Sequence, residues 1–328
     1  MEKIHVPATG WIVFGAVVLG LLLVDLLVHR GKHGESKRSA IAWSIGWIVL
    51  GLGFSVFVWQ AYGARPAQEY LGAWLIEKSL SLDNLFVFLV IFRSLSVPED
   101  EQRRVLFWGI FGALLFRALF IFAGVEALER WHAVVYVFGA ILLFTAYRVA
   151  REDPSKERDS KLVHWLAKRL PVTTELNGTR FFARLNGRRV ATPLMVALIA
   201  IELTDIAFAV DSVPAALAVS HEPFIVYSSN VFAIMGLRAL YIALAHIITQ
   251  LRYLHYGLAA VLAFAGLKMI IPDSVVHVPP LVSVAIIVVC IGLSVVVSLR
   301  ARSKQRRTVP APGGLPPSPP GEQREVHV

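Results

Sequence analysis

The segment from Thr192 to Leu217 decides the fold class, and it reads Thr-Pro-Leu-Met-Val-Ala-Leu-Ile-Ala-Ile-Glu-Leu-Thr-Asp-Ile-Ala-Phe-Ala-Val-Asp-Ser-Val-Pro-Ala-Ala-Leu. As a helix it is long enough to cross the hydrocarbon core of a bilayer, which takes about 20 residues. It nevertheless contains three carboxylates, Glu202, Asp205 and Asp211. A charge inside a membrane is costly unless it faces a cavity or a partner, so the segment predicts a membrane helix that borders an internal polar site.

The rest of the chain repeats this apolar pattern. Of its 328 residues, 56% are hydrophobic and 17% are charged, whereas about 25% of the residues in a soluble domain are charged. Apolar residues come in blocks of about 20, and lipid offers the backbone no hydrogen-bond partners, so each block is predicted to be a helix. We predict an all-α, polytopic transmembrane bundle whose nine spans cover 11–28, 41–60, 70–92, 105–124, 133–150, 193–220, 224–246, 254–271 and 280–299.

The net charge of +9 reflects orientation in the membrane rather than nucleic-acid binding. Lys and Arg gather in alternate loops, namely after the first and third spans, between residues 148 and 189, and in the tail from Arg300. By the positive-inside rule these loops are cytoplasmic, which places the N-terminus outside and the C-terminus in the cytoplasm. The prediction is a multi-pass protein of the inner (cytoplasmic) membrane.

Loops and composition divide the chain into six parts. They are a pair of membrane helices (1–69), a first group of three (70–150), a cytoplasmic loop (151–192), a second group of three (193–271), the last helix (272–302) and a disordered, Pro-rich cytoplasmic tail (303–328). Within the loop, Asn186-Gly187 is the signal of a two-residue turn, so a small β-hairpin is predicted there.

The two groups of three spans resemble each other. Arg117 lies in Phe-Arg-Ala-Leu-Phe-Ile and Arg238 in Leu-Arg-Ala-Leu-Tyr-Ile. Asp83 precedes Arg117 by 34 positions, and Asp205 precedes Arg238 by 33. Further matches relate Tyr136, Ala140, Phe144 and Arg148 to Tyr256, Ala260, Phe264 and Lys268. Three spans per unit turn the second copy upside down, and inverted repeats of this kind are typical of transporters that bind their substrate at the repeat interface.

Polar and ionisable residues cluster in the third and sixth spans, which inverted symmetry would bring together. The third span reads Ile-Glu-Lys-Ser-Leu-Ser-Leu-Asp-Asn from Ile76 to Asn84. The candidate metal ligands of the two spans are Glu77, Asp83, Asn84, Glu202, Asp205, Asp211 and Ser212.

Helical phase separates two of these candidates. In a straight helix Asp211 lies on the opposite side from Glu202. Pro214 removes a hydrogen bond to the carbonyl of Val210, so we predict a kink or a short unwound stretch at Val210–Pro214 that redirects Asp211.

Counting charges indicates the cargo. Five carboxylates (Glu77, Asp83, Glu202, Asp205 and Asp211) face three mid-membrane cations (Lys78, Arg117 and Arg238). Two negative charges remain, which a divalent cation would neutralise. Carboxylate, amide, hydroxyl and carbonyl oxygens suit hard ions such as magnesium, calcium or manganese.

The three cations and one further acid are interpreted separately. We interpret Arg117 and Arg238 as charge-compensating counter-ions of the carboxylates. Lys78 is a further charge-compensating residue or a proton site, because the pKa of a buried lysine shifts readily. Asp25, near the end of the first span, is interpreted as an interfacial residue.

On these residues the sequence resembles the TerC/Alx family of bacterial membrane proteins. The matching stretches lie between about 70 and 270 and are Glu77–Asn84, Thr192–Leu194, Asp205 with Phe208–Ala215, Ser229–Tyr241 and Gly266–Met269. The resemblance implies manganese export and metal homeostasis, tellurite resistance in some members, and kinship with the LysE superfamily of exporters. It implies that the five acidic positions above carry the function, with Asn84 and Ser212 beside them.

The main prediction is a secondary transporter that exports manganese(II) or a similar divalent cation, with no resident cofactor and with protons as the coupling ion. The sequence contains no nucleotide-binding motif and no nucleophile–base pair, so we predict no enzyme. Partners are the metal ion and the lipid bilayer, not nucleic acid; protein partners are not predicted.

Two alternatives stay open. One is a transporter for tellurite or another oxyanion, held by Arg117 and Arg238. The other is a membrane scaffold in envelope stress or protein insertion, with residues 151–192 recruiting its partners.

Overall fold

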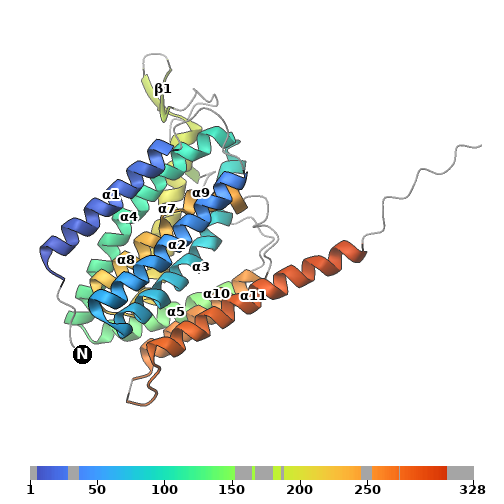
Figure 1. Ribbon diagram of the computed structural model, residues 1–328. Helices are drawn as coiled ribbons and strands as arrows, with labels where there is room; N and C mark the ends of the chain where they lie inside the picture. The colour runs from blue at the N-terminus through green and yellow to red at the C-terminus, as the bar shows by residue number, and fades with distance from the viewer. Residues whose placement is uncertain are drawn as a thin grey trace, which may run out of the picture.

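The computed structural model describes residues 6–28, 37–151, 165–166, 180–185, 188–244, 253–272 and 274–308. Helices dominate this part of the chain and run up and down a single bundle (Figure 1). They are α1 (Ala8–Val28), α2 (Lys37–Tyr62), α3 (Ala64–Ser94), α4 (Glu99–Arg130), α5 (Ala133–Arg151), α7 (Pro193–Leu217), α8 (Pro223–Ile234), α9 (Leu237–Leu244), α10 (Leu254–Ile270) and α11 (Pro280–Thr308).

The helices confirm a polytopic helical membrane protein. Within the described residues, seven helical segments are long and apolar enough to cross a membrane, with α8 and α9 counted together. The two other predicted spans coincide with α3, which carries Glu77, Lys78 and Asp83, and with α10, which is shorter at 17 residues. Within the described residues each apolar block is therefore helical, as the lack of backbone partners in lipid requires, although one block forms two helices.

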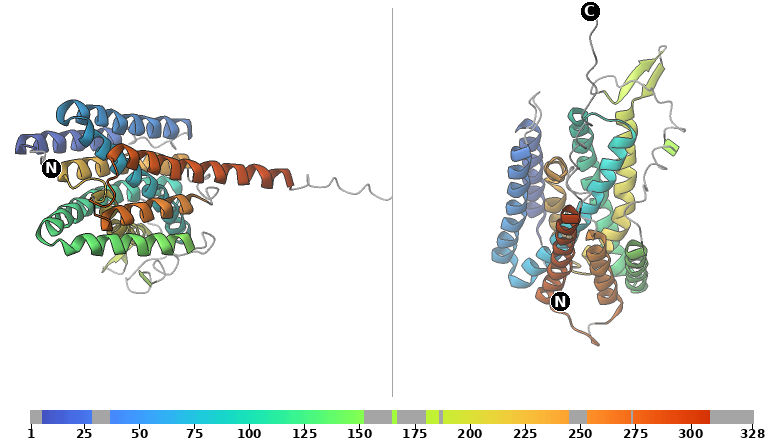
Figure 2. Two further views of the ribbon diagram at one scale, coloured as in Figure 1. Left: turned by 90° about the horizontal axis from the view of Figure 1, so that it is seen from below. Right: turned by 90° about the vertical axis from the view of Figure 1, so that its right-hand side faces the viewer.

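The bundle has an apolar outer surface and a buried centre. Large apolar side chains on α1, α2 and α11 are exposed, for example Leu19, Val49 and Leu293. The segment formed by α8 and α9 is the most deeply buried of the candidate spans. Helix α11 runs along the bundle and extends beyond it (Figure 2). An apolar surface of this extent is suited to lipid, which explains why so much hydrophobic side chain lies outside the core.

The predicted β-hairpin is present. Strand β1 (Phe182–Leu185) pairs antiparallel with β2 (Arg188–Ala191), with Leu185 opposite Arg188. The turn residues Asn186 and Gly187 lie outside the described part of the chain, as do the tail beyond 308 and most of the 151–192 loop. The hairpin lies at the end of the bundle where α7 begins (Figure 1). Thr192 connects them, because its hydroxyl donates a hydrogen bond of 2.8 Å to the Arg180 carbonyl oxygen.

The seventh predicted span is a broken helix rather than a continuous one. Helix α8 ends at Ile234 and α9 begins at Leu237, and between them Gly236 has a φ of +83°. Only glycine adopts this conformation without cost. The side chain of Trp47 on α2 lies directly against Gly236, so a Cβ at this position would also collide with it.

The unwound stretch expected at Val210–Pro214 is not formed. Helix α7 is helical from Pro193 to Leu217, with Pro214 inside it. A single missing hydrogen bond is tolerated where neighbouring helices hold the segment. The predicted unwinding is therefore wrong, and a bend at this point stays a prediction.

The packing of the helices agrees with the proposed repeat. In the proposed repeat, α3 corresponds to α7, α4 to α8 with α9, and α5 to α10. A twofold axis would then relate the contact between α4 and α7 to the contact between α8 and α3, and both contacts are present. Helices α5 and α10 contact each other closely where two glycines meet. A Cβ on Gly139 would lie 3.1 Å from the Gly266 carbonyl oxygen, and one on Gly266 would lie 3.0 Å from the Gly139 oxygen. The inverted superposition itself stays a prediction.

Candidate functional site

A buried arginine connects four helices at the centre of the bundle. Arg117 on α4 is 1% exposed and forms an ion pair with Glu77 on α3. Its Nη2 lies 3.5 Å from Oδ1 of Asp205 on α7, and its Nη1 donates a hydrogen bond of 2.9 Å to Oδ1 of Asn230 on α8. A guanidinium suits this position because its planar donors reach several acceptors at once. These four residues form the Arg117 network.

The Arg117 network holds two of the predicted metal ligands. Glu77 is fully buried and also accepts a hydrogen bond from Ser81, at 3.2 Å. Removing charged groups from water is expensive, and a buried charge persists only when it is paired. The carboxylates of Glu77 and Asp205 are thus neutralised in part by Arg117, which occupies the counter-ion position that the sequence assigned to it.

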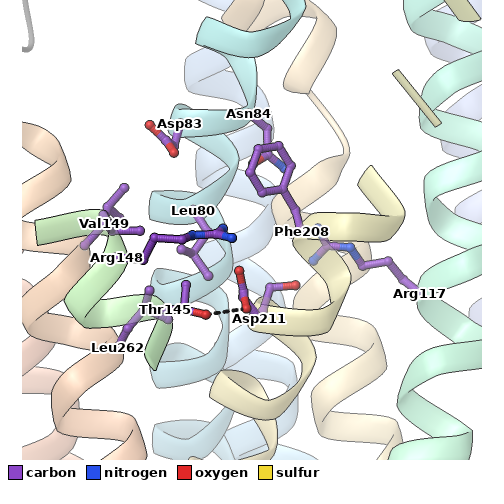
Figure 3. A pocket seen from close by; sticks show the side chains of 12 residues that line it. Leu80, Asp83, Asn84, Arg117, Thr145, Arg148, Val149, Phe208, Asp211 and Leu262 are labelled. Carbon is purple, nitrogen blue, oxygen red and sulfur yellow. Dashed lines mark hydrogen bonds between the residues drawn. The ribbon is translucent and has the colours of Figure 1, made fainter. Parts of the chain in front are cut away.

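A small pocket lies beside the Arg117 network (Figure 3). Its polar lining comes from four helices and consists of Asp83 and Asn84 of α3, Arg117 of α4, Thr145 and Arg148 of α5, and Asp211 and Ser212 of α7. The volume open to the centre of a water molecule is about 30 Å³. A single water needs roughly 10–15 Å³ by this measure. The pocket therefore has room for one ion or a few waters.

Asp211 is held in this pocket by a hydrogen bond. The hydroxyl of Thr145 on α5 donates to Oδ1 of Asp211 over 2.7 Å. Its neighbour Ser212 is buried, and its Oγ has no hydrogen-bond partner among the described residues. A buried hydroxyl without a partner is unusual. The pocket thus contains one fixed carboxylate and one hydroxyl able to accept a further interaction.

Two other predicted residues lie away from the pocket. The carboxylate of Glu202 lies directly against Gly112 of α4, where any side chain at position 112 would collide with it. Lys78 donates a hydrogen bond of 3.0 Å from Nζ to the carbonyl oxygen of Ala233, at the end of α8. A cation is stabilised at this end of a helix because the carbonyl dipoles point toward it.

Arg238 pairs with Asp25, an acid that the sequence predicts to be interfacial. Its Nη2 donates a hydrogen bond of 2.8 Å to Oδ1 of Asp25 on α1. Asp25 is 8% exposed. The carboxylate of Asp25 is therefore buried within the bundle against a cation of α9, and its position at the membrane interface stays a prediction.

The structure thus groups the predicted residues in a way that sequence did not. Asp83, Asn84, Asp211 and Ser212 share the pocket, Glu77 and Asp205 belong to the Arg117 network, and Glu202, Lys78 and Arg238 lie elsewhere. Among the described residues, no three His, Cys, Asp or Glu side chains converge as a metal centre. A cation in the pocket would accordingly combine carboxylate with amide and hydroxyl oxygens.

Three functional candidates were missed: Thr145, Arg148 and Asn230. Thr145 and Arg148 are three positions apart on the fifth span and therefore share a helix face, a signal that could have identified them. Asn230 is an isolated amide in an apolar segment. With Asp25 and Arg148 included, these residues comprise six carboxylates and four cations distributed over the bundle, a formal excess of two negative charges.

The fold and this buried charge define a class of polytopic helical membrane proteins with an internal polar site. The sequence model described as "Integral membrane protein TerC family" matches residues 62–306. The chain therefore belongs to the TerC family of integral membrane proteins.

Relatives cover nearly the whole chain. An "Uncharacterized membrane protein STKORF319" of Myxococcus xanthus is 44% identical over 300 residues, covering 89% of this chain and 94% of the relative. The "Putative membrane-bound redox modulator Alx" of Escherichia coli strain K12 is 43% identical over 289 residues, covering 84% and 90%. An "Uncharacterized membrane protein" of Rickettsia bellii is 34% identical over 293 residues, covering 88% and 97%. No solved structure is significantly similar to the chain.

Proposed function

We propose that the chain is a secondary transporter that exports a divalent cation, with manganese(II) as the principal cargo, from the cytoplasm. The observation that carries this proposal is the pocket lined by Asp83, Asn84, Asp211 and Ser212 inside a membrane bundle. A soluble protein can place such residues at its surface, but in a bilayer they are retained where an ion or a charged substrate passes.

The donor set supports a hard cation. The pocket offers carboxylate, amide and hydroxyl oxygens and no thiol or imidazole among its lining residues. Such oxygens favour magnesium, calcium or manganese over zinc or copper. Manganese is the member of this group that the family resemblance implies. The formal excess of two carboxylates over cations among the buried and pocket-lining residues favours a divalent cation over an oxyanion such as tellurite.

The two buried clusters are assigned different tasks. The Arg117 network contains its own cation and connects α3, α4, α7 and α8, which suits it to hold the helices in place. The pocket carries carboxylates from α3 and α7 beside the hydroxyl of Ser212, which has no hydrogen-bond partner in the part of the chain that the structure describes, and this suits the pocket to bind the cargo. This division makes Asp211 and Asp83 the residues to test first.

The name of one relative refers to redox modulation. This chain has too few thiols to perform such a role by thiol chemistry. The sequence contains a single cysteine, so no internal disulfide or dithiol centre can form. Cys290 lies on α11, outside the pocket. An effect on cellular redox balance would then follow from metal supply rather than from electron transfer by this protein.

The orientation is part of the proposal. We place the protein in the inner membrane with its N-terminus outside and its C-terminus in the cytoplasm, because basic residues concentrate in alternate loops. Under this orientation the hairpin of β1 and β2 is cytoplasmic. Export then means that the pocket accepts the cation from the side of the hairpin and releases it on the other side.

The direct test is the metal content of cells. A strain that lacks its own exporter is loaded with manganese, and efflux is measured by elemental analysis with wild type, Asp211→Asn and Glu126→Gln. Glu126 is an exposed carboxylate paired with Arg130 and is the matched control. We expect efflux with wild type and E126Q and none with D211N at equal protein level. Normal efflux by D211N would refute the assignment.

A further inference from the structure

Arg148 is a cation in the lining of the pocket. It lies in the last turn of α5, is exposed, and forms part of the pocket lining. Its side chain extends from α5 past Leu80, and in this view the guanidinium lies between Asp83 above and Asp211 below (Figure 3). It is close enough to Asp211 to interact electrostatically with the carboxylate.

We propose that Arg148 is a tethered cation that compensates the pocket carboxylates when no cargo is bound and moves aside when a divalent ion enters. This inference rests on the proposed function and deepens it, because it names the residue that sets the affinity and the charge selectivity of the pocket.

Arg148 differs from Arg117 in the property that such an exchange needs. The guanidinium of Arg117 is buried and tied to Glu77, Asp205 and Asn230, so it cannot leave without exposing uncompensated charges. Arg148 is exposed and reaches the pocket on a long, flexible stem. Only Arg148 can therefore leave the pocket at low cost.

The rest of the pocket is supported independently of Arg148. Asp211 keeps its hydrogen bond from Thr145 whether or not the guanidinium is present. Asp83 and Asn84 are carried by α3, which the Arg117 network attaches to α4 and α7. Withdrawal of Arg148 therefore uncovers a formed site instead of collapsing it.

Charge selectivity follows from this competition. A sodium or potassium ion that displaces Arg148 replaces one positive charge with another and gains no net attraction. A divalent cation brings one charge more, and in a low-dielectric site that extra charge is worth more than it is in water. Arg148 thus favours divalent over monovalent cargo, at the expense of absolute affinity.

The experiment measures manganese binding to the purified full-length protein by calorimetry. The variants are wild type, Arg148→Gln, Arg148→Lys and Arg151→Gln. Arg151 is the matched control: it lies three positions further on the same helix, stacks on the Tyr147 ring at 4.7 Å, and does not line the pocket. Melting temperatures establish that each variant is folded.

We expect R148Q to bind manganese about tenfold more tightly than wild type, because one nearby positive charge has been removed. R151Q should bind like wild type, and R148K should restore the weaker binding because it retains the charge. Replacing choline chloride with sodium chloride at constant ionic strength should weaken manganese binding to R148Q by competition but leave wild type unchanged.

Three results would overturn the inference. Equal or weaker binding by R148Q would show that Arg148 does not compete with the cation. An equal gain in manganese affinity in R151Q would show that the effect comes from the general surface charge and not from the position of Arg148. Absence of manganese binding in every variant would refute the proposed function together with this inference, whereas binding that ignores Arg148 would refute the inference alone.

Discussion

Arg238 on α9 donates a hydrogen bond of 2.8 Å to Asp25 on α1, although the two residues are 213 positions apart in the sequence. Helix α9 is the second half of a broken helix, so this ion pair fastens the half that follows the break to the first helix of the chain. Lys78 contacts the other half at Ala233, where α8 ends. Both ends of the break are therefore held by charged side chains.

The Asp25–Arg238 pair is predicted to be structural. Asp25→Asn leaves the guanidinium of Arg238 buried with a weaker partner, which costs roughly 3–5 kcal/mol for a buried pair. We expect D25N and Arg238→Gln each to lower the melting temperature of the purified protein. The double variant should recover part of the loss, because no charge is then left uncompensated. A D25N protein that melts like wild type would show that the pair contributes nothing.

Gly236 is predicted to tolerate no side chain. Gly236→Ala places a Cβ in the left-handed region and against Trp47, so we expect a loss of stability of roughly 1–3 kcal/mol. Gly53→Ala on α2 is the control, since a Cβ there meets nothing within 4 Å. Thermal melting of both proteins decides the matter. A tolerated G236A would mean that the helix break does not depend on glycine.

The helices and hairpin could be predicted because local pattern determines them. A block of apolar residues in lipid must be helical, and Asn186-Gly187 between short strands favours a tight turn. The break at Met235–Gly236 was missed because glycine in an apolar segment is compatible with a continuous helix. Its position depends on Trp47, which is distant in sequence.

The candidate site could be predicted only in part for a related reason. Helical phase correctly separated Glu202 from Asp211, and the structure turns them toward α4 and α5, respectively. The unwound stretch predicted at Pro214 followed from the expectation that all the acids meet at one point. Which helix faces each acid is a tertiary property, so Thr145 and Arg148 were not assigned to the pocket.

The orientation is tested by reporter fusions. Fusions near residues 160, 185 and 310 are expected to report the cytoplasm, and fusions near 65 and 128 the outside, because loops rich in Lys and Arg stay on the cytoplasmic side. Paired reporters, one active on each side of the membrane, provide the control. A cytoplasmic signal at 65 or 128 would contradict the nine-span arrangement.

The last prediction separates the Arg117 network from the pocket. Glu77→Gln removes the fully buried partner of Arg117 and leaves its charge poorly compensated, so it should cost roughly 3–5 kcal/mol and reduce the amount of protein in the membrane. Asp211→Asn can still accept the hydrogen bond from Thr145, so the protein should accumulate normally. Its efflux should nevertheless be abolished, because the cation loses a charged ligand.

Protein level and manganese efflux are measured in the same cells, with Asp83→Asn as a second pocket variant. The two sites should respond differently. E77Q should lose protein from the membrane, whereas D211N and D83N should lose transport at a normal protein level. If the pocket carboxylates were structural as well, all three variants would lose protein first. Full efflux from both D211N and D83N at a normal protein level would exclude the pocket as the binding site, because neither of its carboxylates would then be needed to bind the cation.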